Sequence, residues 1–265
     1  MNQYLLLAGI VIVACVLLHR FAEKLPVPSL LIFIALGMFF GENGPLGIVF
    51  NEYAISENIC SACLIVVMFY GGFGTNVHVA KPVAGRAFLL ASLGVFFTAA
   101  FVGVFSHYLL GLDWMESFLI GAVLSSTDAA SVFNILRSQK MALKDHTDSL
   151  LELESGSNDP MSYLLTVVMV SLVTGQQVSV PVLFLQQMIF GVLGGLLIGW
   201  VSVLLLNRFD FSMEQGKTIF VFAAAIIAYA LPNAVGGNGY LSVYLCGILM
   251  GNRYFPGKRE LVHFF

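Results

Sequence analysis

The chain has 265 residues, of which 58% are hydrophobic and only 10% are charged. Soluble domains average about 25% charged residues, so this composition excludes an ordinary soluble protein and indicates a polytopic helical membrane protein. The net charge of −3 comes without a basic patch, which excludes nucleic acid as a partner and leaves the lipid bilayer as the expected environment.

Nine apolar segments follow one another along the chain, and each predicts a membrane-spanning helix. They cover residues 4–18, 27–41, 55–71, 87–110, 117–136, 150–174, 182–206, 218–232 and 239–251. Several approach the roughly 20 residues that cross a hydrocarbon core, whereas the second and the last two are short. The first has no basic stretch before Tyr4 and no cleavage site before His19-Arg20, so we interpret it as a span rather than a signal peptide.

The basic residues predict the orientation of these spans. With nine spans and the N-terminus outside, all twelve Lys and Arg fall at cytoplasmic loops or ends, and the opposite loops carry only acids. We therefore expect a multi-pass integral protein of the plasma (inner) membrane with its N-terminus outside. The basic residues are Arg20, Lys24, Lys81, Arg86, Arg137, Lys140, Lys144, Arg208, Lys217, Arg253, Lys258 and Arg259, and the opposing acids are Glu42, Glu52, Glu57, Asp113 and Glu116.

One polar stretch opens the sixth span. It reads Leu151-Glu152-Leu153-Glu154-Ser155-Gly156-Ser157-Asn158-Asp159-Pro160 and precedes the almost wholly apolar residues 161–174. An Asp at the centre of a spanning helix costs about 2.5–3.5 kcal/mol, so an intramembrane carboxylate indicates a functional site on an ion or proton path. A buried acid paired with a base of another helix is the alternative, although three carboxylates exceed what one pair needs.

Asp128 and Asp159 are predicted to reach the same depth in the membrane. Each lies nine residues from the cytoplasmic end of its span, near Arg137 and near Leu150 respectively. At about 1.5 Å per helical residue, both lie roughly 13–14 Å into a core about 30 Å thick, close to its midplane.

The acids of the sixth span form a ladder toward the midplane. Ser155 and Asp159 are four residues apart and share a helix face with Glu152, while Glu154 and Asn158 form a second such pair beside it. A water-filled access funnel for cations would need this arrangement. Glu152 and Glu154 could instead lie at the interface and simply contact water.

The fifth span carries Ser125-Ser126-Thr127-Asp128 in its middle. Ser, Thr and Asp compete for backbone hydrogen bonds, so we predict an unwound segment that frees main-chain carbonyls, with that of Thr127 as the natural cation ligand. Asp128 would then lie beside a half-helix N-terminus, whose dipole favours negative charge. Many secondary transporters build substrate sites from such discontinuous helices, although a Ser/Thr cluster can also serve helix packing alone.

Two motifs at these positions resemble the paired signatures of monovalent cation/proton antiporters of the NhaP type, closest to the CvrA-like potassium/proton antiporters. They are Ser126-Thr127-Asp128-Ala129-Ala130-Ser131-Val132-Phe133 and the polar stretch 151–160. A third stretch, from Gly236-Gly237-Asn238-Gly239-Tyr240-Leu241 through Gly251-Asn252, is similar to a later helix of that group. The resemblance covers essentially the whole chain.

The resemblance implies an all-α cation/proton antiporter fold, with inverted repeats and interrupted midplane helices, and a role for each matching residue. Asp159 would bind cation and proton in turn, Ser155 would help to coordinate, and Thr127 would offer its main-chain carbonyl. Asn158 and Asp128 would support the crossed, interrupted helices. The supporting acid Glu154 would pair with an Arg on a later helix that this chain does not reach.

The chain departs from this family in two ways. Where relatives often end the third span in Phe-Asp-Gly-Gly or Phe-Glu-Gly-Gly, this chain reads Phe69-Tyr70-Gly71-Gly72, which leaves open whether K⁺ or Na⁺ is preferred. Relatives also run to about thirteen spans in two inverted repeats. The fold is therefore expected to be incomplete at the C-terminus, and we expect residues 1–265 alone not to transport.

The same resemblance divides the chain into three parts. Residues 1–75 would hold scaffold and dimerisation helices, 85–175 the core ion-translocation helices, and 181–265 a linker span and the start of the second repeat. The first span and the seventh to ninth spans would form the scaffold and a homodimer interface. The spacing of Gly191, Gly194-Gly195 and Gly199 in the seventh span favours close helix packing.

Charge indicates how one carboxylate could couple two fluxes. Desolvation at the midplane favours the protonated form of Asp159, so proton and cation compete for it. The protonated and cation-paired forms carry the same local charge and can cross the barrier, whereas the bare carboxylate is held back because an uncompensated charge in low dielectric is costly. The prediction is one-for-one, electroneutral exchange, and the neutral Asn158 agrees with it because a second Asp there would add a titrating charge.

Other classes of function lack their sequence signals. An intramembrane aspartyl protease needs two facing carboxylates, but Asp159 follows Gly156-Ser157-Asn158 rather than Gly-x-Gly, and a cation channel would need a repeated filter loop. Cys60-x-x-Cys63 has no second ligand pair, and the histidines lie near span ends or in loops. We expect a transporter rather than an enzyme, with no catalytic residue, no metal site and no cofactor.

Overall fold

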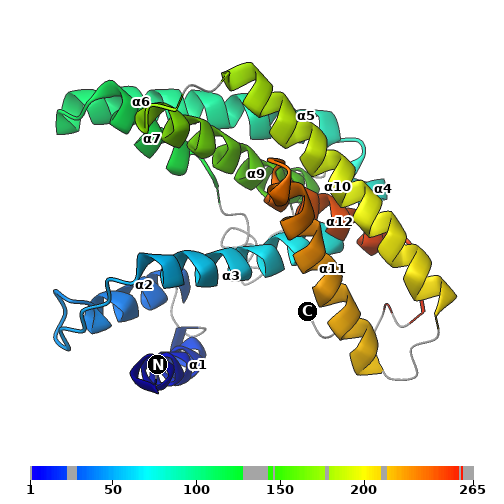
Figure 1. The fold of residues 1–265 in the computed structure, drawn as a ribbon, viewed down its shortest axis with the longest axis horizontal. Helices are drawn as coiled ribbons and strands as arrows, with labels where there is room; N and C mark the ends of the chain where they lie inside the picture. Colours follow the sequence, from blue (N-terminus) through cyan, green and yellow to red (C-terminus); the bar gives the residue numbers. More distant parts are fainter. Residues whose placement is uncertain are drawn as a thin grey trace. The chain divides into compact units, whose positions relative to one another are not determined.

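The computed structural model describes residues 2–22, 29–127, 143–145, 147–176, 179–209, 214–256 and 258, and their regular structure is helical (Figure 1). Of these residues, those up to Glu57 form one compact unit and those from Asn58 onward form a second. The helices are α1 (Asn2–Ala22), α2 (Ser29–Phe40), α3 (Tyr53–Gly74), α4 (Val77–Ala80), α5 (Ala84–Leu89), η1 (Leu90–Gly94), α6 (Val95–Leu110), α7 (Trp114–Val123), α9 (Thr147–Val173), α10 (Val180–Arg208), α11 (Glu214–Ala234) and α12 (Gly239–Asn252).

Each of the nine predicted spans overlaps a helix of the described chain, and where both ends are described they differ from the predicted ones by at most four residues. In the fifth span, α7 ends at Val123 and residues 124–127 are not helical, where an unwound segment was predicted; residues 128–136 lie outside the described part. The sixth span begins at Thr147, three residues before its predicted start. Its first turn carries Asp148, and an acid there interacts favourably with the helix dipole, which explains the earlier start.

Helix length and composition support membrane insertion. Within the described ranges, four helical segments are long and apolar enough to cross a bilayer: Tyr53–Gly74, Ala84–Leu110, Val180–Arg208 and Gly216–Ala234. Shorter apolar helices cover Leu6–Leu18, Leu31–Phe40 and Trp114–Val123. These helices support an integral, multi-pass membrane protein. Most of their large apolar side chains are exposed in the isolated chain, as expected for surfaces that meet lipid or further helices.

The first unit contains α1, α2 and the first turn of α3. α1 and α2 contact each other, but much of their apolar surface is exposed, as at Leu6 and Val16. The functional residues predicted from the sequence lie in the second unit or outside the described chain, so the second unit is the one that builds the site.

The fourth span is a single helical segment interrupted by the π-helical turn η1. The Ser92 hydroxyl donates to the carbonyl of Phe88 at 2.7 Å. This bond gives a partner to a main-chain carbonyl that lies just before the widened turn. π-Turns inside α-helices occur frequently at functional sites. The buried face here carries Ala87 and Ala91, whose small side chains allow α5 and η1 to pack closely against α9.

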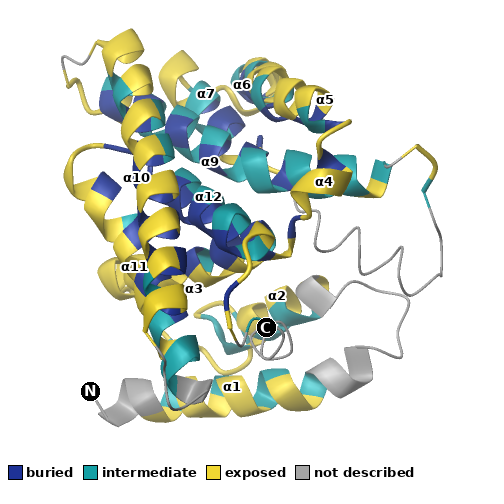
Figure 2. Cartoon of the chain, turned by 90° about the vertical axis from the view of Figure 1, so that its right-hand side faces the viewer, coloured by how far each residue is buried: buried dark blue, intermediate teal, exposed yellow. Residues whose placement is uncertain are grey.

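α12 is the most enclosed helix of the second unit (Figure 2). It packs against α10 and α11 and more lightly against α9. Its buried residues include Tyr240, Val243 and Met250. Together with Phe69 and Phe73 of α3 and with residues of α10 and α11, they form the main hydrophobic core.

Glycines allow α10 to pack backbone to backbone against its neighbours, as their spacing predicted. A Cβ on Gly191 would stand 2.9 Å from the carbonyl oxygen of Asn238, and one on Gly199 would stand 3.2 Å from the Cα of Cys246. A Cβ on Gly194 would overlap the ring of Pro232 on α11. Small residues at membrane helix interfaces serve this purpose, because van der Waals packing rather than hydrophobic burial drives association there.

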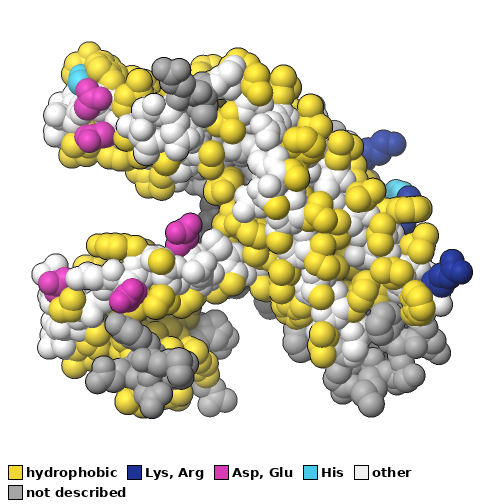
Figure 3. Space-filling view, in the orientation of Figure 1, with side chains coloured by type: hydrophobic (Ala, Val, Ile, Leu, Met, Phe, Trp, Pro, Cys, Tyr) yellow, Lys and Arg dark blue, Asp and Glu magenta, His cyan; other side chains and the backbone are white. Residues whose placement is uncertain are grey.

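Charged residues of the second unit separate along the helices (Figure 3). Asp113 and Glu116 lie at the start of α7, whereas Arg86 lies in α5, near the other end of the 27-residue segment Ala84–Leu110. At 1.5 Å per residue these ends are about 40 Å apart, which is enough to reach opposite faces of a bilayer. The separation agrees with the predicted charge pattern, and the orientation of the chain in the membrane stays a prediction.

Replacing Gly195 by Ala should lower the free energy of unfolding by about 1–3 kcal/mol, because a Cβ there would stand 2.9 Å from the Cα of Ser242 on α12. Gly71→Ala is the matched control, since no atom lies within 4 Å of a Cβ at that position. Thermal unfolding in detergent would measure both variants. Equal losses for the two would contradict the close α10–α12 contact.

Candidate functional site

α9 carries the predicted acid at its middle. The helix has 27 residues, Thr147–Val173, and Asp159 is the thirteenth of them. The side chain of Asp159 is half-buried, and its neighbours Asn158 and Pro160 are fully buried. The structure therefore places an ionisable group halfway along a helix whose residues 161–173 are almost wholly apolar.

The segment after α7 unwinds beside α9. The carbonyl of Ala122, in the last turn of α7, accepts hydrogen bonds from the hydroxyls of Ser125 and Ser162, each at 2.7 Å. The last carbonyls of a helix lack the backbone N–H that normally bonds them from four residues later, and the two hydroxyls donate to this carbonyl instead. Ser162 belongs to α9, so this bond also ties the end of α7 to the helix that carries Asp159.

Thr127 is joined to α9 through both its backbone and its side chain. Its main-chain carbonyl accepts a hydrogen bond from the Ser155 hydroxyl at 2.7 Å, and its own hydroxyl donates to Glu154 Oε2 at 3.3 Å. Asn158 Nδ2 also donates to the Thr127 hydroxyl. Thr127 itself lies outside the helices of the described chain, and its carbonyl faces the polar side of α9.

Asn158 is the buried centre of this polar cluster. Its Nδ2 donates to Glu154 Oε1 at 3.2 Å in addition to Thr127. Its Oδ1 atom is buried and has no hydrogen-bond partner among the residues that the structure describes. A buried acceptor of this kind is costly unless water or a cation meets it, so this oxygen is suited to either.

Asp159 faces the same unwound segment. Its Oδ1 accepts a hydrogen bond from the hydroxyl of Ser126. Ser126 was not among the predicted site residues, although its position next to Thr127 in a Ser/Thr cluster is a signal that could have identified it. The carboxylate therefore lies beside a hydroxyl, an amide and a main-chain carbonyl within one short stretch of chain.

Most of the predicted site residues meet here. Asp159, Asn158, Ser155, Thr127 and Glu154 are held together by hydrogen bonds between α9 and residues 126–127. Glu152 lies toward the C-terminal end of α3: its Oε1 is 3.9 Å from the place where a Cβ on Gly74 would stand. Asp128 lies outside the described residues.

A second face of α9 packs against α12. A Cβ on Gly156 would overlap the ring of Tyr244, so glycine is required for this approach. The rings of Tyr163 and Tyr240 meet edge to face with centroids 4.9 Å apart. Sequence reasoning noted this part of α12 only as a motif and did not connect it with the acid.

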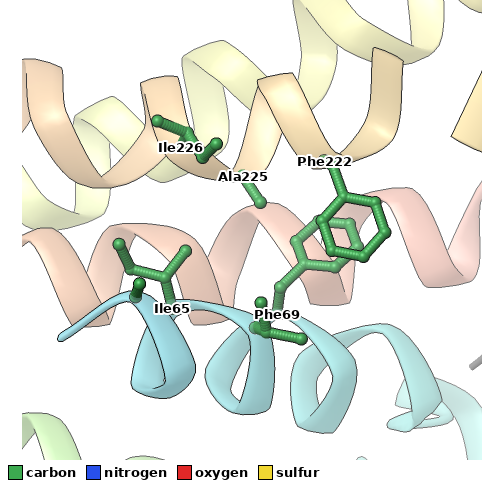
Figure 4. Close-up of a pocket in the computed structure, with 7 residues that line it drawn as sticks. Ile65, Phe69, Phe222, Ala225 and Ile226 are labelled. Carbon is green, nitrogen blue, oxygen red and sulfur yellow. The ribbon is translucent and has the colours of Figure 1, made fainter. Parts of the chain in front are cut away.

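An apolar pocket of about 280 Å³ lies elsewhere in the second unit, between α3 and α11 (Figure 4). Its lining is hydrocarbon: Ala62, Ile65, Val66, Phe69, Phe222, Ala225 and Ile226. Alkali and other hard cations prefer oxygen ligands, which this lining does not offer. The polar cluster on α9, and not this pocket, is the candidate ion site.

A helical membrane fold with an unwound segment beside a mid-helix carboxylate is typical of secondary transporters. The chain belongs to the sodium/hydrogen exchanger transmembrane family, whose family model matches residues 10–264. The family predicted from the motifs is thereby confirmed.

Named relatives within this family are antiporters. The K⁺/H⁺ antiporter NhaP2 of Shewanella oneidensis is 34% identical over 99% of this chain and 46% of its own length. The K⁺/H⁺ antiporter NhaP of Alkalimonas amylolytica is 36% identical over 96% of this chain and 45% of its own length. The Na⁺/H⁺ antiporter ApNhaP of Aphanothece halophytica is 26% identical over 89% of this chain. The chain spans about half the length of these curated relatives.

The fold is also that of a solved antiporter. The electron-microscopy structure of the sodium proton antiporter MjNhaP1 from Methanocaldococcus jannaschii matches with a TM-score of 0.78 and 21% sequence identity. The match covers 95% of this chain and 62% of that one. The predicted all-α antiporter fold is therefore confirmed.

Asn158→Ala should lower the free energy of unfolding by about 1–3 kcal/mol, because it removes the buried donor to Thr127 and Glu154. The control Asn51→Ala, at an exposed position before α3, should change it by less than about 0.5 kcal/mol. Thermal unfolding in detergent measures both. Indistinguishable values for the two variants would contradict a structural role for the polar cluster.

Proposed function

We propose that this chain forms the ion path of a secondary active transporter that exchanges a monovalent cation, K⁺ or Na⁺, for protons. The observation that carries the proposal is the half-buried Asp159 at the middle of α9, bonded to Ser126 in the non-helical segment that also contains Thr127. The names of its relatives as K⁺/H⁺ and Na⁺/H⁺ antiporters support it. Intramembrane carboxylates mark ion and proton paths in membrane proteins generally.

In this proposal, Asp159 alternately binds the cation and the proton. The cation would lie between the carboxylate and the oxygen atoms that surround it, namely the Thr127 carbonyl, the hydroxyls of Ser126 and Ser155, and Asn158 Oδ1. Carboxylate, carbonyl and hydroxyl oxygens are the ligands that hard cations prefer. The hydrogen bond from Ser155 to the Thr127 carbonyl supports this role, because it holds the carbonyl toward α9.

Competition at one carboxylate couples the two fluxes. Asp159 carries no net local charge when it is protonated or paired with the cation, so both loaded forms can cross the low-dielectric barrier. The empty carboxylate is retained, because moving an uncompensated charge through that barrier is costly. Neither ion is then released unless the other replaces it.

We propose that the exchange is electroneutral. The residue beside the acid is Asn158, which is neutral and hydrogen-bonded to Glu154 and Thr127. One titrating carboxylate that takes one monovalent cation or one proton transfers no net charge per cycle.

The same proposal extends to how the protein is arranged. The N-terminus would lie outside a plasma (inner) membrane, as the distribution of Lys and Arg favours. Residues 85–175 would form the ion-translocating core, and residues 1–75 and 181–265 would supply the scaffold and the homodimer interface. The exposed apolar faces of α1 and α10 agree with such an interface, since a protein partner could cover them in place of lipid.

The rival functions receive less support. An intramembrane aspartyl protease would carry Gly-x-Gly before its acid, whereas Asp159 follows Gly156-Ser157-Asn158. A channel would need a symmetric filter loop with repeated carbonyl donors, and the sequence shows no such repeat. Membership of an exchanger family favours a transporter over both, and over an enzyme.

Asp159→Asn in the full-length protein should abolish cation/proton exchange, because the side chain then neither binds a proton nor balances a cation. The assay is cation-dependent dequenching of a pH-sensitive dye in everted vesicles, with Na⁺ and K⁺ compared. Asp148→Asn is the matched control, since Asp148 is exposed in the first turn of the same helix. Exchange that persists in Asp159→Asn would overturn the proposal.

Electroneutral exchange should proceed at the same rate whether or not a membrane potential is imposed. The measurement uses proteoliposomes in which an ionophore for an ion other than the test cation sets the potential. A rate that rises or falls with the imposed potential would show a net charge transfer per cycle, and would exclude the one-for-one scheme.

A further inference from the structure

Asn238 joins three helices at one buried point. Its side chain is fully buried, and its Nδ2 donates to the main-chain carbonyl of Pro160 on α9 at 2.9 Å. Its Oδ1 accepts from the backbone N–H of Leu241 at 3.0 Å and so caps the first turn of α12. Its own backbone N–H donates to the carbonyl of Gln187 on α10 at 3.0 Å.

The bond to α9 lies next to Asp159, where that helix is weakest. Pro160 has no backbone N–H, so the carbonyl of Gly156 loses the donor that a helix normally provides four residues later, and the proline ring crowds that carbonyl. A helix is free to bend at such a point. Asn238 holds the carbonyl of Pro160 itself, one peptide unit from the acid, and fixes it to α12.

We propose that Asn238 is a positioning residue for Asp159. Through Pro160 it sets the direction of the α9 segment that carries the acid, and so the distance between the carboxylate and the oxygen atoms of residues 126–127. The inference rests on the proposed exchange at Asp159, and it adds a residue of α12 that does not touch the ion.

The two polar atoms of the Asn238 side chain make different hydrogen bonds, and this makes the inference testable. Oδ1 caps α12, whereas Nδ2 holds Pro160. Serine is as good as asparagine at a helix N-cap, but it has no amide donor to replace Nδ2. Asn238→Ser therefore keeps the cap and removes the bond to α9, whereas Asn238→Ala removes both.

In the full-length protein, Asn238→Ser should raise the KM for the cation about three- to tenfold at fixed pH, the effect of one lost hydrogen bond, with a smaller change in maximal rate. Dye dequenching in everted vesicles, normalised to the amount of protein, gives both constants. A purely structural role would lower the amount of folded protein and the maximal rate without changing KM. An unchanged KM in Asn238→Ser would overturn the inference.

Asn207→Ser is the matched control. The Asn207 amide also donates to two main-chain carbonyls, those of Val203 and Tyr254, at 2.9 and 3.2 Å, but it is exposed and does not contact α9. Its KM for the cation should equal that of the unmodified protein. A rise equal to that of Asn238→Ser would show that loss of any such bond has the same effect, and would overturn the inference.

A double-mutant cycle with Pro160→Ala tests the route through the proline. Alanine restores the N–H that Pro160 lacks, so α9 holds its own direction and the effect of Asn238→Ser on KM should shrink. An effect of equal size in both backgrounds would overturn the inference. Where transport by the Pro160 variants is too weak to measure, the rise in melting temperature on adding K⁺ or Na⁺ reports cation binding directly, with the same outcomes.

The two proposals fail in different ways. If the unmodified protein shows no exchange, or Asp159→Asn retains it, the proposed function falls and this inference falls with it. If exchange depends on Asp159 but Asn238→Ser has the KM of the unmodified protein, only the role of Asn238 is overturned.

Discussion

The structure depends on keeping a carboxylate at the middle of a membrane helix. Asp159 would be strongly unfavourable there if it faced hydrocarbon, so the chain has to surround it with polar groups. The unwound residues 124–127 provide these groups, because a helix in the same place would have bonded its carbonyls internally. The non-helical residues 124–127 and the acid on α9 are therefore one feature, joined by hydrogen bonds between them.

The composition of α9 is poor for a helix, and tertiary contacts compensate. Between residues 155 and 160 the helix contains two serines, a glycine, an asparagine, an aspartate and a proline, all of which have low helix propensity. Most of them have a partner or a packing reason in the structure. Ser155 bonds to Thr127, Gly156 admits Tyr244, Asn158 bonds to Glu154, and Pro160 accepts from Asn238.

The sequence predicted the helices and the residues of the site that lie on α9 and at Thr127. Apolar length located the nine spans because each helix must cover a fixed thickness of hydrocarbon, and the Ser/Thr cluster with Asp128 predicted the unwound segment at Thr127. It did not predict that Ser126 would meet Asp159. This contact depends on which turn of α9 faces the non-helical residues after α7.

The contacts that α12 makes with α9 and α10 could not be predicted from the sequence, for a related reason. Asn238 lies 78 residues from Pro160 along the chain, and an N-cap asparagine has the same sequence signal whether its amide is bonded or not. Likewise, the glycine stripe of α10 indicated close packing but did not identify α12 as the partner. Gly195 meets Ser242 only because both helices cross at that level.

Two adjacent faces of α9 explain how the acid is aimed. Ser155, Asn158, Asp159 and Ser162 are spaced at three, four and seven residues and form the face that bonds to residues 122–127. Gly156, Pro160 and Tyr163 have the same kind of spacing and form a second face, about 100° around the helix, that contacts α12. With contacts on one face only, α9 could still rotate about the row of residues that make those contacts. Two faces fixed at once remove this freedom, so the contacts with α12 help to determine where Asp159 points.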